Sequence, residues 1–235
     1  MTSISRKITR KLQAYYFNMK LKLYGFLKLP AQTEKERRIF KDLFDKAGDG
    51  KALRIFEWGS GYSTLYYARY LTGKGVDFEW HSIDNNRAWH ERVKEFVKKE
   101  NLQSKVYLHL MEFMPFWEKP GWGPVPPPCN RFAPSSDNEK NYVDYPVRLG
   151  IKFDVIIVDA RFRRRCIQAA REALQPDGIV VLHDAHKMQY HDGLDLYPYR
   201  RFIESGNWYP MQNESNQMWV GSPENSSVYA RLKNF

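Results

Sequence analysis

The chain has 235 residues, of which 43% are hydrophobic, enough for one large domain with a core and too many for a disordered chain. Its net charge of +10 favours anionic partners such as nucleic acid, lipid headgroups or acidic substrates. Two cysteines argue against a disulfide framework, and no apolar run is long enough to span a bilayer. Lysines interrupt the first apolar stretches, unlike a secretory signal. We therefore expect a cytoplasmic protein.

Residues 1–32 are predicted to form a basic amphipathic helix. From Met1 to Thr33 the sequence holds seven basic residues and no acidic one. Apolar residues recur every three or four positions until Pro30, as a helix face requires: Ile4, Ile8, Leu12, Tyr15, Tyr16, Met19, Leu23, Phe26 and Leu27. Two interpretations stay open. Residues 4–29 bind an anionic surface at the inner face of a membrane, or the helix packs on its own domain or a second subunit.

Residues 33–235 are predicted to form one domain of alternating strands and helices. A helix is expected from Thr33, a good capping residue, to about Ala47. The predicted strands are Arg54–Trp58, Asp77–Asp84, Lys105–Met111, Phe153–Asp159 and Ile179–His183, with two more near Trp208–Gln212 and Gln217–Gly221. Helices follow the first, second and fourth strands, and another is expected near Tyr199–Glu204. This alternation predicts an α/β fold with a doubly wound, mostly parallel Rossmann-like sheet of about seven strands flanked by helices.

A long segment rich in proline, residues 115–146, separates the third and fourth predicted strands. Its proline content excludes a helix or a central strand, and we expect a lid or binding loop. Two tryptophans of this segment, Trp117 and Trp122, could stack on a sugar or an aromatic acceptor, or belong to a local core. We take Trp122 as a candidate substrate contact.

The strongest motif is the run Glu57-Trp58-Gly59-Ser60-Gly61-Tyr62-Ser63-Thr64, directly after a strand and before a helix. Ligands of open α/β sheets bind outside the carboxyl ends of the strands, where glycines let backbone N–H groups approach them. A dinucleotide site would need glycine or alanine at Thr64. The pattern E-x-G-x-G-x-S-T instead resembles the first motif of class I S-adenosylmethionine (SAM)-dependent methyltransferases. The resemblance implies that Glu57, Gly59, Ser60, Gly61, Ser63 and Thr64 surround the methionine part of SAM.

Two further positions match the cofactor half of this family. Asp84 ends the second strand, and a carboxylate there can accept both ribose hydroxyls, with Asn85 beside it. The other interpretation is that Asp84 caps the next helix. After the third strand, the resemblance implies that Glu112 and Phe113 contact the adenine, although Glu112 could equally be solvated.

The fourth and fifth strands end in candidate catalytic residues. Asp159 could hold the ammonium group of SAM, orient the acceptor or bind a metal, and His183 could act as general base. Arg161 and Asp184 are candidate substrate contacts. Asp159 and Asp184 could together hold a divalent cation, but Ala185 stands where metal-dependent relatives have a further acidic or amide residue, so a metal is not favoured.

A cluster of four arginines marks the next helical start: Arg161, Arg163, Arg164 and Arg165. Positive charge at a helix N-terminus is electrostatically unfavourable. It therefore indicates either an anionic ligand or acidic partners nearby, and a carboxylated or phosphorylated acceptor would suit Arg161.

The resemblance covers about Lys51 to Gly221 and implies an enzyme that uses SAM to methylate an oxygen of a small-molecule or glycan-type acceptor. One alternative is an RNA methyltransferase or binder that uses the basic N-terminus. However, no Asn-Pro-Pro-Tyr motif follows the fourth strand, which disfavours methylation of base amino groups. Another alternative is a membrane-associated protein that binds SAM without catalysis. The sequence predicts neither the acceptor atom nor the oligomeric state.

Overall fold

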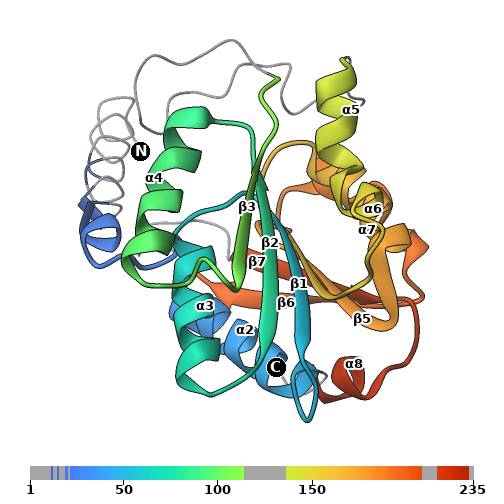
Figure 1. Cartoon of the computed structure of the whole chain (residues 1–235). Helices are drawn as coiled ribbons and strands as arrows, with labels where there is room; N and C mark the ends of the chain where they lie inside the picture. Colours follow the sequence, from blue (N-terminus) through green and yellow to red (C-terminus); the bar gives the residue numbers. More distant parts are fainter. Residues whose placement is uncertain are drawn as a thin grey trace, which may run out of the picture.

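The computed structural model describes residues 22–113, 136–207 and 216–232, together with positions 12, 15, 19 and 20. A seven-stranded sheet with the order β3-β2-β1-β4-β5-β7-β6 forms its centre, which confirms the predicted Rossmann-like α/β fold. Helices α3 and α4 lie on one side of the sheet and α5, α6 and α7 on the other (Figure 1). Within these described ranges, no helix combines the length and the apolar character that crossing a bilayer requires.

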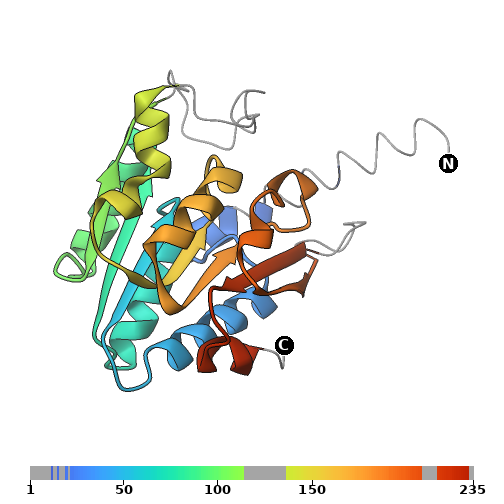
Figure 2. The same cartoon turned by 90° about the vertical axis from the view of Figure 1, so that its right-hand side faces the viewer.

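Five parallel strands make up most of the sheet: β1 (Leu53–Trp58), β2 (Phe78–Asp84), β3 (Val106–Leu110), β4 (Phe153–Val158) and β5 (Leu174–Leu182). The strands β6 (Tyr199–Gly206) and β7 (Asn216–Ser222) complete it as an antiparallel pair at the end opposite β3 (Figure 2). Trp58 pairs with both Ile83 and Val158, so β1, β2 and β4 end level with one another. The strand order reverses between β1 and β4, the position where ligands bind in open α/β sheets.

The helices cover the two faces of the sheet with separate apolar clusters. One face carries α2 (Glu34–Ala47), α3 (Tyr62–Gly73), α4 (Arg87–Lys99) and α8 (Ser227–Arg231), and the other carries α5 (Asp137–Val143), α6 (Tyr145–Arg148) and α7 (Arg163–Ala173). Neighbouring side chains of a strand point to opposite faces. Ile55 and Phe56 of β1 accordingly belong to different clusters, and both are fully buried.

The helix predicted near Tyr199–Glu204 is wrong, because this segment is strand β6. Its side chains alternate between exposed and buried, and Ile203 pairs with Met218 of β7. Pairing with the next strand, β7, therefore decided the conformation. The strand predicted near Trp208–Gln212 lies outside the described residues, whereas the one at Gln217–Gly221 is confirmed as part of β7.

The loop predicted at residues 115–146 is partly wrong as well. Its last part forms α5 and α6, starting at a capping box in which Ser136 and Glu139 each accept a hydrogen bond from the other's backbone N–H. Pro146 lies in the first turn of α6, where a helix tolerates proline. Residues 114–135, with Trp117 and Trp122, lie outside the described residues.

Candidate functional site

The first glycine of the turn after β1 is required by the protein itself. Gly59 has φ +100°, and an added Cβ would lie 2.7 Å from the carbonyl oxygen of Asp159 at the end of β4. The same crossing of β1 and β4 is closed by a hydrogen bond from the Asp159 N–H to the Trp58 carbonyl. Any other residue at position 59 would separate the two strand ends.

The second glycine has no such structural reason. Gly61 has φ −177°, an extended conformation open to any residue, and an added Cβ would meet its nearest neighbour, the Trp89 ring, at 3.8 Å. Trp89 of α4 also holds the turn, because its indole Nε1–H donates to the Ser60 carbonyl at 2.6 Å. The backbone at Gly61 therefore leaves room for a ligand to approach closely, and the predicted cofactor contact stays a prediction.

The glutamate of the motif holds the start of α3 to the sheet through hydrogen bonds. Glu57 is fully buried and accepts hydrogen bonds from Ser63, Thr64, Trp80 and Ser82 at 2.5–3.1 Å. Burial raises the pKa of Glu57 to about 7, although the bonds from Ser63, Thr64 and Trp80 lower it. The hydroxyls of two predicted cofactor residues, Ser63 and Thr64, thus donate their hydrogen bonds to Glu57. Their contact with a cofactor stays a prediction.

A buried carboxylate lies beside this turn at the end of β2. Asp84 accepts the backbone N–H of Asn86 at 2.8 Å, while the side chain of Asn86, not of Asp84, caps helix α4. Burial raises the pKa of Asp84 from 3.8 to about 6, partly opposed by the N–H groups of Asn86 and Asn85 and by the Arg161 charge. Capping of α4 therefore does not explain the aspartate, and its predicted contact with the ribose of a cofactor stays a prediction.

The residues after β3 lie at the carboxyl ends of the strands, as do the glycine turn and Asp84. Glu112 is ion-paired with Arg87 of α4, and its backbone carbonyl accepts from Asn138 of α5. The Phe113 ring packs against Tyr142 and Phe162, with centroids 4.9 and 5.3 Å away. Phe113 thus presents an apolar surface beside the edge, and the predicted adenine contact stays a prediction for both residues.

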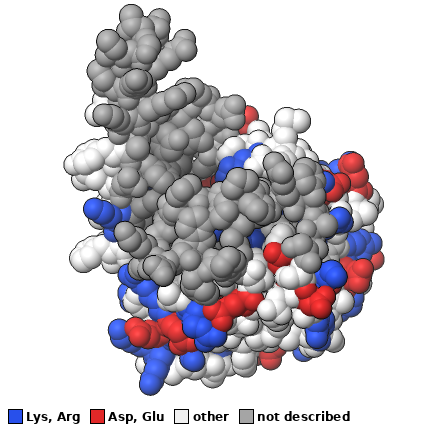
Figure 3. All heavy atoms as spheres, turned by 90° about the horizontal axis from the view of Figure 1, so that it is seen from above, with Lys and Arg blue, Asp and Glu red and all other residues white. Residues whose placement is uncertain are grey.

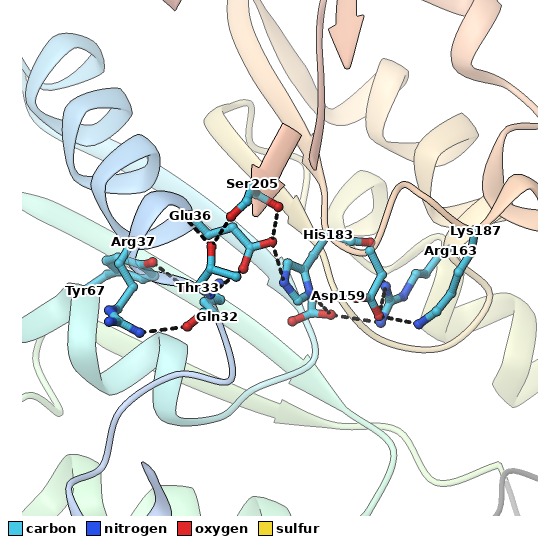
Figure 4. A network of polar contacts seen from close by, with 11 residues as sticks. Gln32, Thr33, Glu36, Arg37, Tyr67, Asp159, Arg163, His183, Lys187 and Ser205 are labelled. Atoms are coloured by element: carbon cyan, nitrogen blue, oxygen red, sulfur yellow. Dashed lines mark hydrogen bonds and ion pairs between the residues drawn. The ribbon is translucent and has the colours of Figure 1, made fainter. Parts of the chain in front are cut away.

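A chain of buried charges joins β4 and β5 to the N-terminus of α2 (Figure 4). The His183 Nδ1 lies 3.0 Å from Asp159 Oδ1, and its Nε2 lies 3.5 Å from Glu36 Oε1. Glu36 forms the capping box of α2 with Thr33 and also accepts from Ser205 of β6 at 2.8 Å. One carboxylate therefore caps a helix, binds the end of β6 and faces the histidine.

The electrostatics of this chain bear on the predicted base. Burial by itself disfavours the imidazolium, but Asp159, Glu36 and Asp184 outweigh it and raise the pKa of His183 well above its usual range. The pKa of Glu36 shifts in the opposite direction. Burial alone would raise it, but the charge of His183 and the hydrogen bonds that Glu36 accepts lower it below its usual value. At neutral pH His183 is therefore a cation between carboxylates, which does not suit a general base.

Sequence reasoning missed the role of Arg163, at the start of α7. Its guanidinium donates to Asp159 at 2.9 Å, Asp184 at 3.3 Å and the His183 carbonyl at 2.7 Å, and it covers the Tyr190 ring at 4.9 Å. The signal was the arginine cluster, for which acidic partners were one interpretation. Those partners are confirmed for Arg163 and for Arg164, whose partner is Asp192.

Arg161 differs from its neighbours in the cluster. It is partly buried, it lies close enough to Asp84 to lower that pKa, and it forms no ion pair with any described residue. The described part of the chain also contains no group of three His, Cys, Asp or Glu side chains that could hold a metal. Asp159 and Asp184, the two carboxylates considered for a metal, share the Arg163 guanidinium instead.

The face above the carboxyl ends carries both signs of charge. Acidic and basic side chains lie next to each other over its described part, without one continuous basic patch (Figure 3). The alternative of a nucleic-acid partner places the contact on the basic N-terminus, so this face does not test it.

The chain was compared with known proteins. The O-methyltransferase TomG from Streptomyces achromogenes, solved with SAM, is 15% identical, covers 84% of each chain and has a TM-score of 0.55. An O-methyltransferase from Bacillus cereus, solved with SAH, is 13% identical, covers 85% of this chain and 86% of its own, and has a TM-score of 0.56. The chain shares the fold of these O-methyltransferases. No family model and no curated protein matches the sequence.

The methyltransferase fold does not by itself name the reaction. Spermidine synthase from Thermotoga maritima has a TM-score of 0.50 at 13% identity, covering 82% of this chain and 60% of its own. One fold thus supports different reactions, and function has to be argued from the site.

We expect Gly59→Ala to destabilise the fold by about 3 kcal/mol, because the new Cβ clashes with the Asp159 carbonyl and the positive φ is strained. Urea unfolding followed by circular dichroism measures this. Gly73→Ala, at the end of α3 with open space around it, is the control and should change stability by less than about 1 kcal/mol. Equal stability of the two variants would contradict the close crossing of β1 and β4.

We expect Glu36→Gln to lower the pKa of His183 and to destabilise the fold by about 3 kcal/mol, since it removes one partner of a buried ion pair. Because folding raises the pKa of His183 and lowers that of Glu36, the pair stabilises fully between pH 4.5 and pH 6.5. It fades as the pH rises through the folded pKa of His183 or falls through that of Glu36. Histidine NMR titration and urea unfolding are the measurements. Glu34→Gln, an exposed change in the same helical turn, is the control. An unchanged His183 pKa would refute the pairing.

We expect Asp84→Asn to stabilise the ligand-free protein at alkaline pH. A carboxylate whose pKa rises from 3.8 to about 6 on folding costs stability as the pH rises through that interval, on the order of 3 kcal/mol above it. The difference in melting temperature between variant and wild type should thus grow from pH 4 to pH 7.5. Asp77→Asn, at a side chain that is 82% exposed, should show no such growth. A variant that is less stable at every pH would disprove the burial cost.

Proposed function

We propose that this protein is an enzyme that uses SAM to methylate an oxygen of a small-molecule or glycan-type acceptor. The observation that carries the proposal is the pairing of Gly61, a glycine that the protein itself does not need, with the buried carboxylate of Asp84. Both lie at the switch point of a fold shared with O-methyltransferases solved with SAM and SAH.

The chain offers a separate group to each part of SAM. The backbone from Gly59 to Gly61 lies at the N-terminus of α3, where the helix dipole favours the carboxylate of the methionine part. The N–H groups of Gly59 and Gly61 already donate to the Ile83 carbonyl and the Thr64 hydroxyl, so the N–H of Ser60 is the one proposed to bind that carboxylate. Asp84 offers paired acceptors for the ribose hydroxyls, and binding them would compensate its burial. Phe113 offers an apolar ring for the adenine, and Asn85 and Glu112 complete the proposed set. When bound, SAM supplies a methyl group on a positively charged sulfur.

The acceptor side consists of Asp159 and the cations around it. Asp159 is the more exposed member of its pair with His183, at 26% against 8% of the side chain. We assign proton acceptance to Asp159 and not to His183, which stays protonated between its carboxylates. His183 and Arg163 orient the Asp159 carboxylate from two sides. Alignment of the acceptor is the main requirement, because the transferred group is already activated.

The cations at the edge favour an acceptor that carries negative charge. Arg161 is partly buried beside Asp84 and forms no ion pair with a described residue. A guanidinium there can bind a carboxylate or phosphate through two hydrogen bonds. Asp184 already forms ion pairs with Arg163 and Lys187. We therefore propose that it fixes Arg163, which in turn binds Asp159, and that it is not the main contact of the acceptor.

Isothermal titration calorimetry should show binding of SAM and SAH with micromolar affinity. We expect Gly61→Ala to weaken it about tenfold or more, because the Cβ fills the space that the ligand would use, while the unfolding curve stays close to wild type. Gly73→Ala is the matched control for the loss of a glycine. Wild-type affinity in Gly61→Ala, or no binding by the folded wild type, would refute the proposed site.

A further inference from the structure

The described part of the N-terminal helix leaves its apolar side chains in solvent. Residues 22–26 are helical, as are positions 12, 15, 19 and 20. The large apolar residues among them and just beyond, which we call the N-terminal stripe, are all exposed by about half or more: Leu12 55%, Tyr15 66%, Met19 53%, Leu23 54%, Phe26 84% and Leu27 48%. From Leu12 to Phe26 they follow one another at steps of three or four and so share one face, and Leu27 lies four residues after Leu23. Packing of this face on its own domain is therefore wrong for the described positions.

The opposite face of the helix is the one that contacts the domain. A Cβ on Gly25 would lie 3.6 Å from the hydroxyl of Tyr62, the first residue of α3. The helix ends at Lys28, whose φ of +51° belongs to a cap in which the Leu29 N–H donates to the Tyr24 carbonyl. Lys28 forms an ion pair with Glu100, the residue that follows α4 at its C-terminal end. The N-terminal helix lies next to α4 (Figure 1). These contacts direct the N-terminal stripe outward.

Positive charge borders this stripe. At 3.6 residues per turn, Lys20 and Lys22 fall on its two opposite flanks, and Lys22 is exposed. The sequence from Met1 to Thr33 supplies seven of the ten net positive charges of the chain and holds no acid. An apolar face between flanking lysines is the pattern of a helix that lies in the headgroup layer of an anionic bilayer.

We infer that the N-terminal helix docks on a membrane surface rich in anionic phospholipids, with the N-terminal stripe inserted among the acyl chains. A second copy of the chain fits the face less well, because pairing two such helices would bring together two segments that carry only positive charge. An anionic bilayer meets both the apolar and the charged requirement. Since Gly25 lies against Tyr62, next to Gly61, docking would hold the glycine turn near the bilayer surface.

Vesicle flotation with the full-length protein tests the inference independently of any catalysis. We expect binding to vesicles of phosphatidylglycerol and phosphatidylcholine at low salt, and far less to pure phosphatidylcholine. The double change Leu23→Ser with Phe26→Ser should lower the partition coefficient about tenfold or more. Lys22→Gln should lower it about fivefold on the anionic vesicles alone.

Matched controls separate this surface from general stickiness. Met188→Ser with Leu196→Ser removes two other exposed apolar side chains, and Lys94→Gln removes an exposed lysine of α4; neither should change flotation. Circular dichroism of every variant confirms the fold. The inference is overturned if wild type does not float with anionic vesicles, or if the Leu23/Phe26 variant floats as well as wild type. It is equally overturned if light scattering shows a dimer that this variant abolishes while wild type ignores the vesicles.

Discussion

The position of His183 between Glu36 and Asp159 is the constraint on which the rest of the site depends. Removing charges from water is costly, and such a cluster persists only when every member has a partner. Here the partners come from α2, β4, β5 and α7, so the same charges that surround Asp159 also fasten the capping box of α2 to the sheet. The edge that we propose as an active site is thereby also the place where the layers of the fold are joined.

The two glycines of the turn, Gly59 and Gly61, are present for different reasons. Gly59 lets β1 and β4 come together, and its cause is visible inside the protein. Gly61 and Asp84 have no comparable internal cause: one leaves space, and the other keeps a carboxylate buried with a raised pKa. Features that cost stability or leave space without structural benefit are typical of functional sites. This contrast separates the proposed ligand-binding part of the motif from its structural part.

The shared fold narrows the chemistry but leaves the reaction to the side chains. Two O-methyltransferases and a spermidine synthase all resemble this chain in fold. The side chains on which our proposals rest are His183 with its raised pKa beside Asp159, the guanidinium of Arg161 near Asp84, and the exposed N-terminal stripe. They support the proposed anionic acceptor and the inferred membrane surface.

The sequence alone determined the five parallel strands, the helices after β1, β2 and β4, the glycine turn and the position of Asp84, because these follow from local periodicity and short motifs. It did not determine α5 and α6, which lie in a segment whose prolines predicted a loop. Nor did it determine β6, because the segment near Tyr199–Glu204 is predicted as a helix and only its pairing with β7 shows that it is a strand. Nor did it reveal that Glu36 faces His183 or that Arg163 joins Asp159 to Asp184. Those contacts join residues from separate elements, or depend on the direction in which the start of a helix faces the sheet. Only the tertiary structure therefore decides which charged side chains meet, and it is their meeting that raises the pKa of His183.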